Sequence, residues 1–204
     1  MKAIRNEYAD QGVETFYKTN ATAYENPHFS YIESLLQKNK ERIDYTHILD
    51  FCSGGGEVTM ALQKMGFPNS IGCDPYTHIL FENNTKKPCF TYNFEDVVKG
   101  NFTFDLPKYD TPAVPIVSGC RSSIFSAIIC SFAMHLCPDK MLQPLVLQLF
   151  SLSKHIVIIT PHKRPELEKI DNIYLDFEDY VLTERGKKVF LKIYQHQYGL
   201  TAHT

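Results

Sequence analysis

Apolar and polar positions along this chain change their spacing from block to block, and the spacing predicts the element that each block forms. Apolar residues recur every three or four positions over 5–19 and 29–43, as on one face of a helix. The same spacing predicts helices at 57–65, 77–85 and 139–153, with a helical turn at 94–98. Pro144 fits a helix only in its first turn, because proline has no N–H to donate.

Short apolar runs between these helices predict strands. The runs lie at 46–52, 69–74, 89–93, 125–132 and 155–160. Two longer runs, 174–183 and 187–195, flank Glu184-Arg185-Gly186, which is a hairpin signal. We therefore predict an α/β fold with a seven-stranded, mostly parallel sheet, helices on both faces and a C-terminal antiparallel hairpin. Residues 99–124, with three prolines, are expected to form a surface excursion.

Composition narrows the class of protein. The 204 residues are 44% hydrophobic and 13% aromatic, which is enough for one substantial core. A net charge of −2, from 21 basic and 23 acidic residues, implies no overall attraction to nucleic acid or to a membrane. No apolar run resembles a signal peptide or could span a bilayer, so we expect a cytoplasmic protein, with the nucleus as an alternative. The oligomeric state is not indicated.

Cysteine spacing predicts no metal site. The six cysteines form no Cys-x-x-Cys pair and no grouping with histidine at metal-ligand spacing. Cys52, Cys73 and Cys130 lie in or beside predicted strands, where a free thiol behaves as a small apolar side chain.

A glycine turn carries the main functional signal. The run Ile48-Leu49-Asp50-Phe51-Cys52-Ser53 leads directly into Gly54-Gly55-Gly56 and a helix, and the next strand ends at Asp74-Pro75. Glycines let a ligand approach the backbone and permit positive φ where a strand turns into a helix. A carboxylate at the end of the neighbouring strand can accept hydrogen bonds from both hydroxyls of a ribose. The sequence therefore predicts that a nucleotide-like ligand lies on this turn.

These motifs, in this order, resemble the class I, Rossmann-like S-adenosylmethionine-dependent methyltransferases over residues 45–196. Asp50, Gly54 and Gly56 match the first family motif, with Cys52 where a glycine is commonest. Asp74 matches the carboxylate that grips the ribose. The resemblance implies S-adenosylmethionine as cofactor and methyl transfer as the reaction.

The resemblance also implies further cofactor contacts. Glu95 and Asp96 stand where the family lines the adenine, and Ser131 and Phe132 match the wall near the methionine half. The segment with Tyr17, Tyr24 and His28 resembles a helical cap of small methyltransferases, so we divide the chain into a cap at 1–44 and a methyltransferase domain at 45–204. The remaining expected contacts are Ser53, Pro75, Tyr76 and Phe94.

A dinucleotide is the competing cofactor, because NAD-binding folds use a similar turn with an acid on the ribose. Asp50 inside the strand, where it can orient the turn and reach a cationic group through water, argues for the sulfonium cofactor instead. The terminal hairpin argues the same way.

Three histidines are candidate bases for an acceptor that must lose a proton. His135 and His162 follow the fourth and fifth strands, at the edge where ligands bind in such sheets, and His28 precedes the helix at 29–43. His135 and His162 could instead cap the next helix or bond a loop, and His28 could face either the pocket or solvent. Lys163 and Arg164 could hold an anionic acceptor or could simply be solvated.

The acceptor class stays open among three hypotheses. A small-molecule acceptor is favoured, because the chain is small and shows no basic face. An RNA or protein acceptor could dock on 99–124 and on Lys163-Arg164. A non-catalytic cofactor-binding scaffold is the third possibility. Strand four ends in Cys130-Ser131-Phe132, without an Asn/Asp-Pro-Pro motif, which argues against methylation of exocyclic amino groups on adenine or cytosine.

Overall fold

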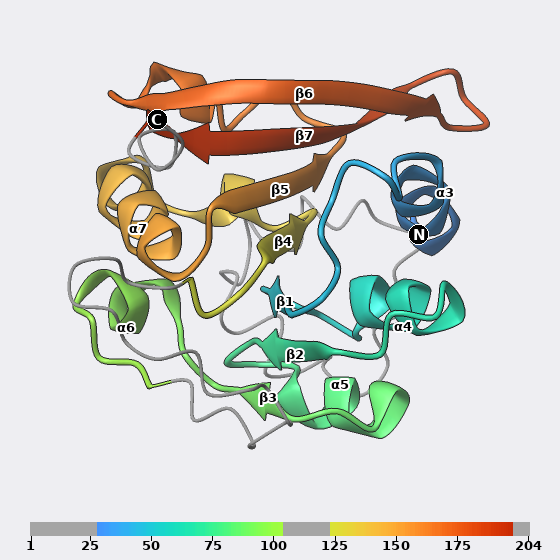
Figure 1. The fold of residues 1–204 in the computed structure, drawn as a ribbon, viewed down its shortest axis with the longest axis horizontal. Helices are drawn as coiled ribbons and strands as arrows, with labels where there is room; N and C mark the ends of the chain where they lie inside the picture. Colours follow the sequence, from blue (N-terminus) through green and yellow to red (C-terminus); the bar gives the residue numbers. More distant parts are fainter. Residues whose placement is uncertain (1–27, 104–122, 198–204) are drawn as a thin grey trace, which may run out of the picture.

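A computed structural model describes residues 28–103 and 123–197 of the chain (Figure 1). Seven strands form one sheet in the order β3-β2-β1-β4-β5-β7-β6. The strands are β1 (Ile48–Phe51), β2 (Ser70–Cys73), β3 (Cys89–Phe90), β4 (Ala127–Ser131), β5 (His155–Thr160), β6 (Ile173–Leu182) and β7 (Lys188–His196). Among these strands β7 alone runs in the direction opposite to the other six. The predicted mostly parallel sheet with a terminal hairpin is confirmed.

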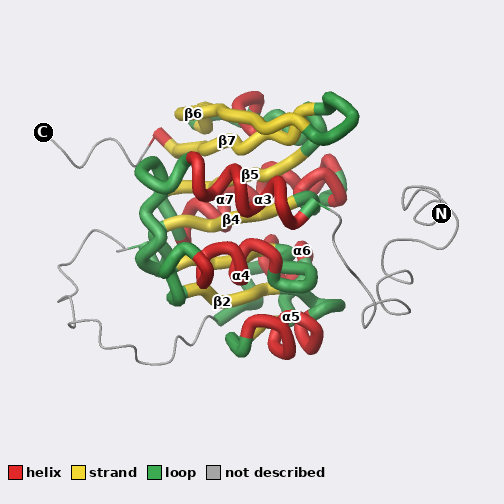
Figure 2. Tube along the Cα trace, turned by 90° about the vertical axis from the view of Figure 1, so that its right-hand side faces the viewer, coloured by secondary structure: helices red, strands yellow, loops and turns green. Residues whose placement is uncertain are grey.

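Helices cover both faces of the sheet, as predicted (Figures 1 and 2). One face carries α3 (Phe29–Lys38), α4 (Glu57–Lys64) and α5 (His78–Thr85), and the other carries α6 (Phe94–Val98) and α7 (Asp139–Leu152). Two short 3-10 helices, η2 (Met134–Leu136) and η3 (Leu167–Lys169), follow β4 and β5. Within the described ranges, no helix is long and apolar enough to cross a membrane.

Most predicted boundaries differ from the structure by one or two residues, and three features differ more clearly. The helix expected over 29–43 ends at Lys38, where the Asn39 side chain donates to the Leu35 carbonyl at 3.0 Å and competes with the next helical turn. The strand expected at 89–93 is reduced to two residues. Pro144 lies in the second turn of α7 rather than the first. The carbonyl that proline leaves without a helical partner belongs to Lys140, which is exposed, so water can satisfy it.

The core is divided by the sheet into two layers. Side chains from α3 and α4 pack against one face, and those from α7 pack against the other. Every residue of β1, β2 and β4 is buried, which fits strands covered on both sides. The described part of the predicted cap, α3, shares the core with the sheet. The division at residue 44 stays a prediction, because most of the cap lies outside the described residues.

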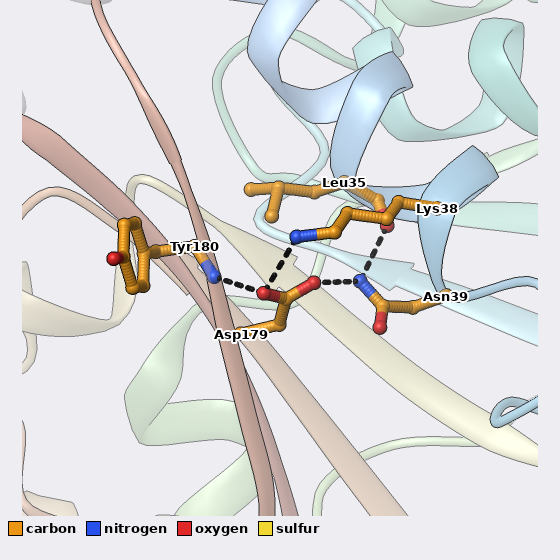
Figure 3. Close-up of polar contacts among 5 residues, drawn as sticks. All are labelled: Leu35, Lys38, Asn39, Asp179 and Tyr180. Carbon is orange, nitrogen blue, oxygen red and sulfur yellow. Dashed lines mark hydrogen bonds and ion pairs between the residues drawn. The ribbon is translucent and has the colours of Figure 1, made fainter.

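A polar clamp fixes the end of α3 to the hairpin (Figure 3). The Asp179 carboxylate on β6 accepts from Lys38 Nζ at 2.8 Å and from Asn39 Nδ2 at 3.0 Å. It also accepts from the backbone N–H of Tyr180 at 2.8 Å. Burial raises the pKa of Asp179, but these hydrogen bonds outweigh it, so the net shift is downward.

The strand order reverses between β1 and β4. From β1 the chain builds outward through β2 and β3, and from β4 it builds the other way through β5. In open α/β sheets, ligands bind at the carboxyl ends of the strands beside such a reversal. The residues that follow the two strands, Cys52 and Phe132, both have positive φ, at 57° and 55°. The backbone therefore bends sharply at this edge.

Candidate functional site

The glycine turn is held by backbone hydrogen bonds to β2. Cys52 N and Ser53 N both donate to the Cys73 carbonyl, at 2.8 and 3.3 Å, and Gly56 N donates to the Ser53 carbonyl at 2.8 Å. Gly54 and Gly56 have φ of 56° and 91°, which glycine adopts without strain. A Cβ on Gly56 would lie 2.4 Å from Thr85 Cγ2, so α5 leaves no room for a side chain there.

Asp74 joins the end of β2 to the glycine turn. Its Oδ1 accepts from the backbone N–H groups of Tyr76 and Thr77, at 2.9 and 3.0 Å, and its Oδ2 accepts from Gly54 N at 3.2 Å. The residue is only 9% exposed. A carboxylate offers about four lone-pair positions. Oδ2 therefore keeps capacity to accept from a ligand hydroxyl at the turn.

Two more carboxylates lie behind the turn. Asp50 is fully buried, and its Oδ2 accepts from Thr59 N at 3.1 Å and Thr59 Oγ1 at 2.9 Å. Asp50 therefore holds the first turn of α4, and its Oδ1 has no partner among the described residues. Glu57, 6% exposed, folds back to accept from the backbone N–H groups of Gly55 and Gly56 and from its own.

Burial and mutual repulsion shift these acids together. Burial raises the pKa of Asp50 well above its usual value, against the Thr59 hydrogen bonds, and the nearby Glu57 adds to the rise. Burial also raises the pKa of Glu57 to about 6, with Asp74 adding to the shift against the backbone hydrogen bonds. Three crowded acids create a site that favours positive charge.

Two of the predicted histidines are in contact. His135 lies in η2 after β4, and His162 lies two residues after β5, where its N–H donates to Thr160 Oγ1 at 3.1 Å. Their ring centroids are 4.4 Å apart. Both residues have exposed surface, but partial burial of the His135 ring lowers its pKa, and the charge of His162 lowers it further. Neither histidine caps the helix that follows it.

The third histidine stacks on the end of β4. The rings of His28 and Phe132 are 4.8 Å apart and nearly parallel, with 2° between their planes. Partial burial lowers the pKa of His28. Ser131, buried, is the last residue of β4, and Phe132 N donates to the Ile159 carbonyl at 2.7 Å. The three histidines therefore all lie at the carboxyl edge of β4 and β5.

Comparison with known proteins identifies the fold. No family model matches the sequence. An uncharacterized protein of Schizosaccharomyces pombe is 26% identical over 207 residues, covering 81% of this chain and 77% of the relative. Magnesium protoporphyrin IX methyltransferase from Synechocystis PCC 6803, solved with bound SAM, has a TM-score of 0.58 at 11% identity, covering 94% and 95%. A SAM-dependent methyltransferase from Anabaena variabilis has a TM-score of 0.61 at 10% identity, covering 90% and 93%.

The chain has the SAM-dependent methyltransferase fold. A ribosomal protein L11 methylase from Lactobacillus delbrueckii subsp. bulgaricus also shares it, with a TM-score of 0.53 at 13% identity over 85% of this chain and 81% of that one. The fold thus serves neighbours whose acceptors range from a porphyrin to a protein.

The two acids expected near the adenine, Glu95 and Asp96, interact with residues of their own helix α6 and its ends. Asp96 and Asn93 form a capping box at the start of α6, and Glu95 pairs with Lys99 at 2.6 Å. Phe94 packs at an angle on Phe51, with centroids 6.0 Å apart. Their contact with an adenine stays a prediction. Pro75 and Tyr76 are half-buried beside Asp74, at the mouth of the turn.

Thiols surround the glycine turn without forming a reactive site. The Cys52 thiol is hydrogen-bonded to Cys130, and this bond together with burial raises its pKa well above normal. Ser53 Oγ lies 3.6 Å from Cys89 Sγ, and burial raises the pKa of Cys73. Protonated thiols are poor nucleophiles. They act here as packing groups, as predicted for Cys52, Cys73 and Cys130.

Tyr17 and Tyr24, two expected cofactor contacts, lie outside the described residues. The sequence interpretation missed Glu57, because an acid in the first turn of a helix is ordinarily explained by the helix dipole. It also missed Tyr31, whose hydroxyl accepts from Glu184 N at 3.3 Å and whose ring lies 5.9 Å from that of His28. No spacing in the sequence relates residues so far apart.

Proposed function

We propose that the protein binds S-adenosylmethionine on the glycine turn and transfers its methyl group to an acceptor at the histidine edge. The observation that carries this proposal is the gathering of three buried carboxylates, Asp50, Glu57 and Asp74, around the turn. S-adenosylmethionine carries a positive sulfonium, whereas a dinucleotide carries a negative pyrophosphate. A bound cation lowers the raised pKa values of these acids and is stabilised by their ionised forms, whereas a bound anion would raise the pKa values further.

Glu57 makes the dinucleotide less favourable still. A pyrophosphate in a dinucleotide fold is bound by the free N–H groups at the start of the helix after the glycine turn. Here the Glu57 carboxylate already accepts from those N–H groups. A phosphate would have to displace a buried acid of the same sign of charge. The turn therefore supports a cationic nucleoside better than a phosphorylated one.

The residues at the glycine turn fit the ribose of the cofactor. Asp74 Oδ2 would accept from the ribose hydroxyls, and the bare backbone at Gly54 would let the ligand lie against the turn. When bound, S-adenosylmethionine supplies a methyl group already activated by the sulfonium, so catalysis rests on alignment. An acceptor that carries a proton would give it to an imidazole nitrogen of His135 or His162. The lowered pKa of His135 keeps that ring neutral and able to accept.

Calorimetry of the full chain tests the proposal. We expect S-adenosylmethionine and S-adenosylhomocysteine each to bind with a stoichiometry near one, and NADH to give no heat of binding. Binding of NADH alone would overturn the cofactor assignment. Incubation with methyl-labelled cofactor and fractionated cell extract then tests transfer, and the labelled fraction reveals whether a small molecule, RNA or protein is the acceptor. Stoichiometric binding without label transfer to any fraction would favour a scaffold.

A further inference from the structure

The β6–β7 hairpin extends beyond the edge at which the histidines lie. β7 pairs with β5 only as far as Thr160↔Phe190, whereas β6 and β7 continue to pair to Leu182↔Lys188. The turn at 183–187 lies further out again, as Figure 1 shows. We call this region, formed by the loop 161–166 and hairpin residues 180–190, the basic ledge. The loop includes His162, whose N–H donates to Thr160 Oγ1, and Thr160 pairs with Phe190 of the hairpin. The ledge therefore adjoins the histidine edge.

Cations collect on the basic ledge although the whole chain is slightly acidic. All of them are exposed: Lys163, Arg164, Arg185, Lys187 and Lys188. Within the described part of the chain, no carboxylate forms an ion pair with the first four. The acids nearby are Glu184 in the turn, Glu166 at the end of the loop, which pairs with Lys169 at 2.6 Å, and Glu178, which pairs with the nearly buried Lys192 at 3.4 Å. The hydrogen bond from Lys169 lowers the pKa of Glu166, and the charge of Arg164 also helps to lower it. The ledge therefore carries a local excess of positive charge.

Flat apolar side chains lie among these cations on one face of the hairpin. Tyr180 and Phe190 are directly opposite in the β6–β7 ladder, with ring centroids 6.1 Å apart. Tyr180 is 41% exposed, and Leu182, two residues on, is 58% exposed. Lys188 Nζ lies 3.8 Å from the Tyr180 ring centroid and 5.9 Å from that of Phe190. Between β5 and β6 the chain forms only the short η3, so this connection places no long helix of the described residues over this end of the face.

We propose that the basic ledge docks a single-stranded nucleic acid and so delivers the methyl acceptor to the histidine edge. Single strands are bound by cations that track the phosphates and by aromatic rings on which bases stack. The ledge offers both within one stretch of hairpin. An acidic peptide would use the cations but not the paired rings, and a membrane surface would call for a broader apolar face than Tyr180 and Leu182 provide.

This inference rests on the proposed function only in one respect: that the docked strand receives the methyl group. The favoured small-molecule acceptor was argued from a chain without a basic face, and the described residues include one. Docking itself does not require the cofactor, so the two proposals can fail separately. Loss of cofactor binding would leave nucleic-acid binding in place, and loss of nucleic-acid binding would leave cofactor binding in place.

Fluorescence anisotropy with a labelled 12-nucleotide oligouridine and the full chain tests the ledge. The double variant Lys187→Glu/Lys188→Glu should weaken binding at least tenfold and should flatten the dependence of log Kd on log salt by about 1.4, for two phosphate contacts. Tyr180→Ala should weaken binding about tenfold with the salt dependence unchanged, because it removes stacking rather than charge. The matched control is Lys40→Glu/Lys154→Glu, which makes the same charge change away from the ledge and should retain more affinity than the ledge variant.

The results separate the alternatives. Equal loss in the ledge and control double variants would show a nonspecific charge effect and overturn the proposal. The proposal would also fail if Tyr180→Ala had no effect and if poly-glutamate or anionic vesicles bound as tightly as RNA. That pair of results would assign the ledge to another partner. A DNA oligomer of the same length distinguishes the two nucleic acids. S-adenosylhomocysteine affinity, measured on each variant, should not change, and circular dichroism checks that each variant is folded.

Discussion

The Asp74 carboxylate and the backbone N–H of Gly54 are joined by a hydrogen bond of 3.2 Å that links the ends of two parallel strands. The acid of β2 therefore helps to shape the glycine turn of β1 before any ligand arrives. Its other oxygen holds the backbone of Tyr76 and Thr77. One side chain thus positions both walls of the cofactor site and retains capacity for the ribose.

Replacing Asp74 should damage cofactor binding more than folding. Asp74→Ala removes charge-assisted hydrogen bonds worth about 1.5 to 3 kcal/mol, so Kd for S-adenosylhomocysteine should rise roughly ten- to hundredfold. The lost contacts to the turn should lower the free energy of unfolding by about 1 to 2 kcal/mol. Calorimetry and urea unfolding measure the two effects. Asp171→Ala, at an exposed acid, is the control. Cofactor affinity equal to that of the control would remove Asp74 from the site.

The glycine turn should tolerate no side chain at Gly56. Gly56 and Gly66 share nearly the same φ, 91° and 88°, but a Cβ on Gly66 would meet nothing within 4 Å. Gly66→Ala therefore reports backbone strain alone, about 1 to 2 kcal/mol. Gly56→Ala adds the clash with Thr85, about 1 to 3 kcal/mol more, and should also weaken cofactor binding. Equal unfolding free energies for the two variants would show that Thr85 and α5 move to accommodate the new methyl group without loss of stability.

The contact between His135 and His162 should be visible in the titration of His135. Partial burial and the charge of His162 lower the pKa of His135 below the ordinary value of 6.5, so its ring is protonated only at lower pH. His162→Phe removes the charge and should raise the pKa of His135, moving the acid limb of any His135-dependent activity to higher pH. NMR titration of the His135 ring measures this without knowledge of the acceptor.

His47→Phe is the control for that titration, because His47 stands immediately before β1, at the opposite edge of the sheet. If the pKa of His135 is unchanged in His162→Phe, the charge of His162 does not influence the His135 ring. Turnover should fall in His135→Ala or His162→Ala with cofactor affinity unchanged. Full turnover in both would leave the histidines as ordinary loop residues.

The clamp between α3 and the hairpin should stabilise the fold in a pH-dependent way. Asp179→Ala removes the acceptor for Lys38 and Asn39 and should cost about 1 to 2 kcal/mol at pH 7. The pKa of Asp179 is lowered on folding, so its contribution is present above pH 3.8 and is lost as the pH falls through the lowered value. Urea unfolding at pH 7 and pH 3 measures the change. Asp176→Ala, an exposed acid on the same strand, should show neither effect.

Most helices and strands could be predicted from the spacing of apolar residues along the chain. The run at 155–160 became β5 without change, and the hairpin around Glu184-Arg185-Gly186 formed as expected, because each signal lies within a few neighbouring residues. The predicted end of the first described helix, at residue 43, was wrong, because the Asn39 side chain bonds to the Leu35 carbonyl and the helix ends at Lys38. The spacing of apolar residues does not contain that signal. Strand order, by contrast, has no local signal.

Some residues of the candidate site have a local signal in the sequence, and others come together only through the fold. The glycine turn and Asp74 could be predicted, because residue type and spacing carry them. The contact of His135 with His162 depends on β4 and β5 being neighbours in the sheet. The basic ledge joins Lys163 to Lys188, which lie 25 positions apart in the chain, so a sequence-wide charge balance conceals it. Glu57 lies close to Gly55, where a Cβ would stand 3.3 Å from Glu57 Oε1, and periodicity does not indicate this contact.

Glu57 should make the choice between charged and neutral cofactor depend on pH. Its pKa is raised to about 6, so the carboxylate is neutral at pH 5 and negative at pH 7. The sulfonium of S-adenosylmethionine gains from that charge, whereas S-adenosylhomocysteine has none at sulfur. If bound sulfonium lowers the pKa of Glu57 by about one unit, the affinity ratio of the two should rise about fivefold from pH 5 to pH 7. Calorimetry at both pH values measures the ratio, and Glu57→Gln should hold it constant. A ratio that still rises in Glu57→Gln would assign the titration to Asp50, and a flat ratio in the unaltered protein would refute the role of the carboxylates.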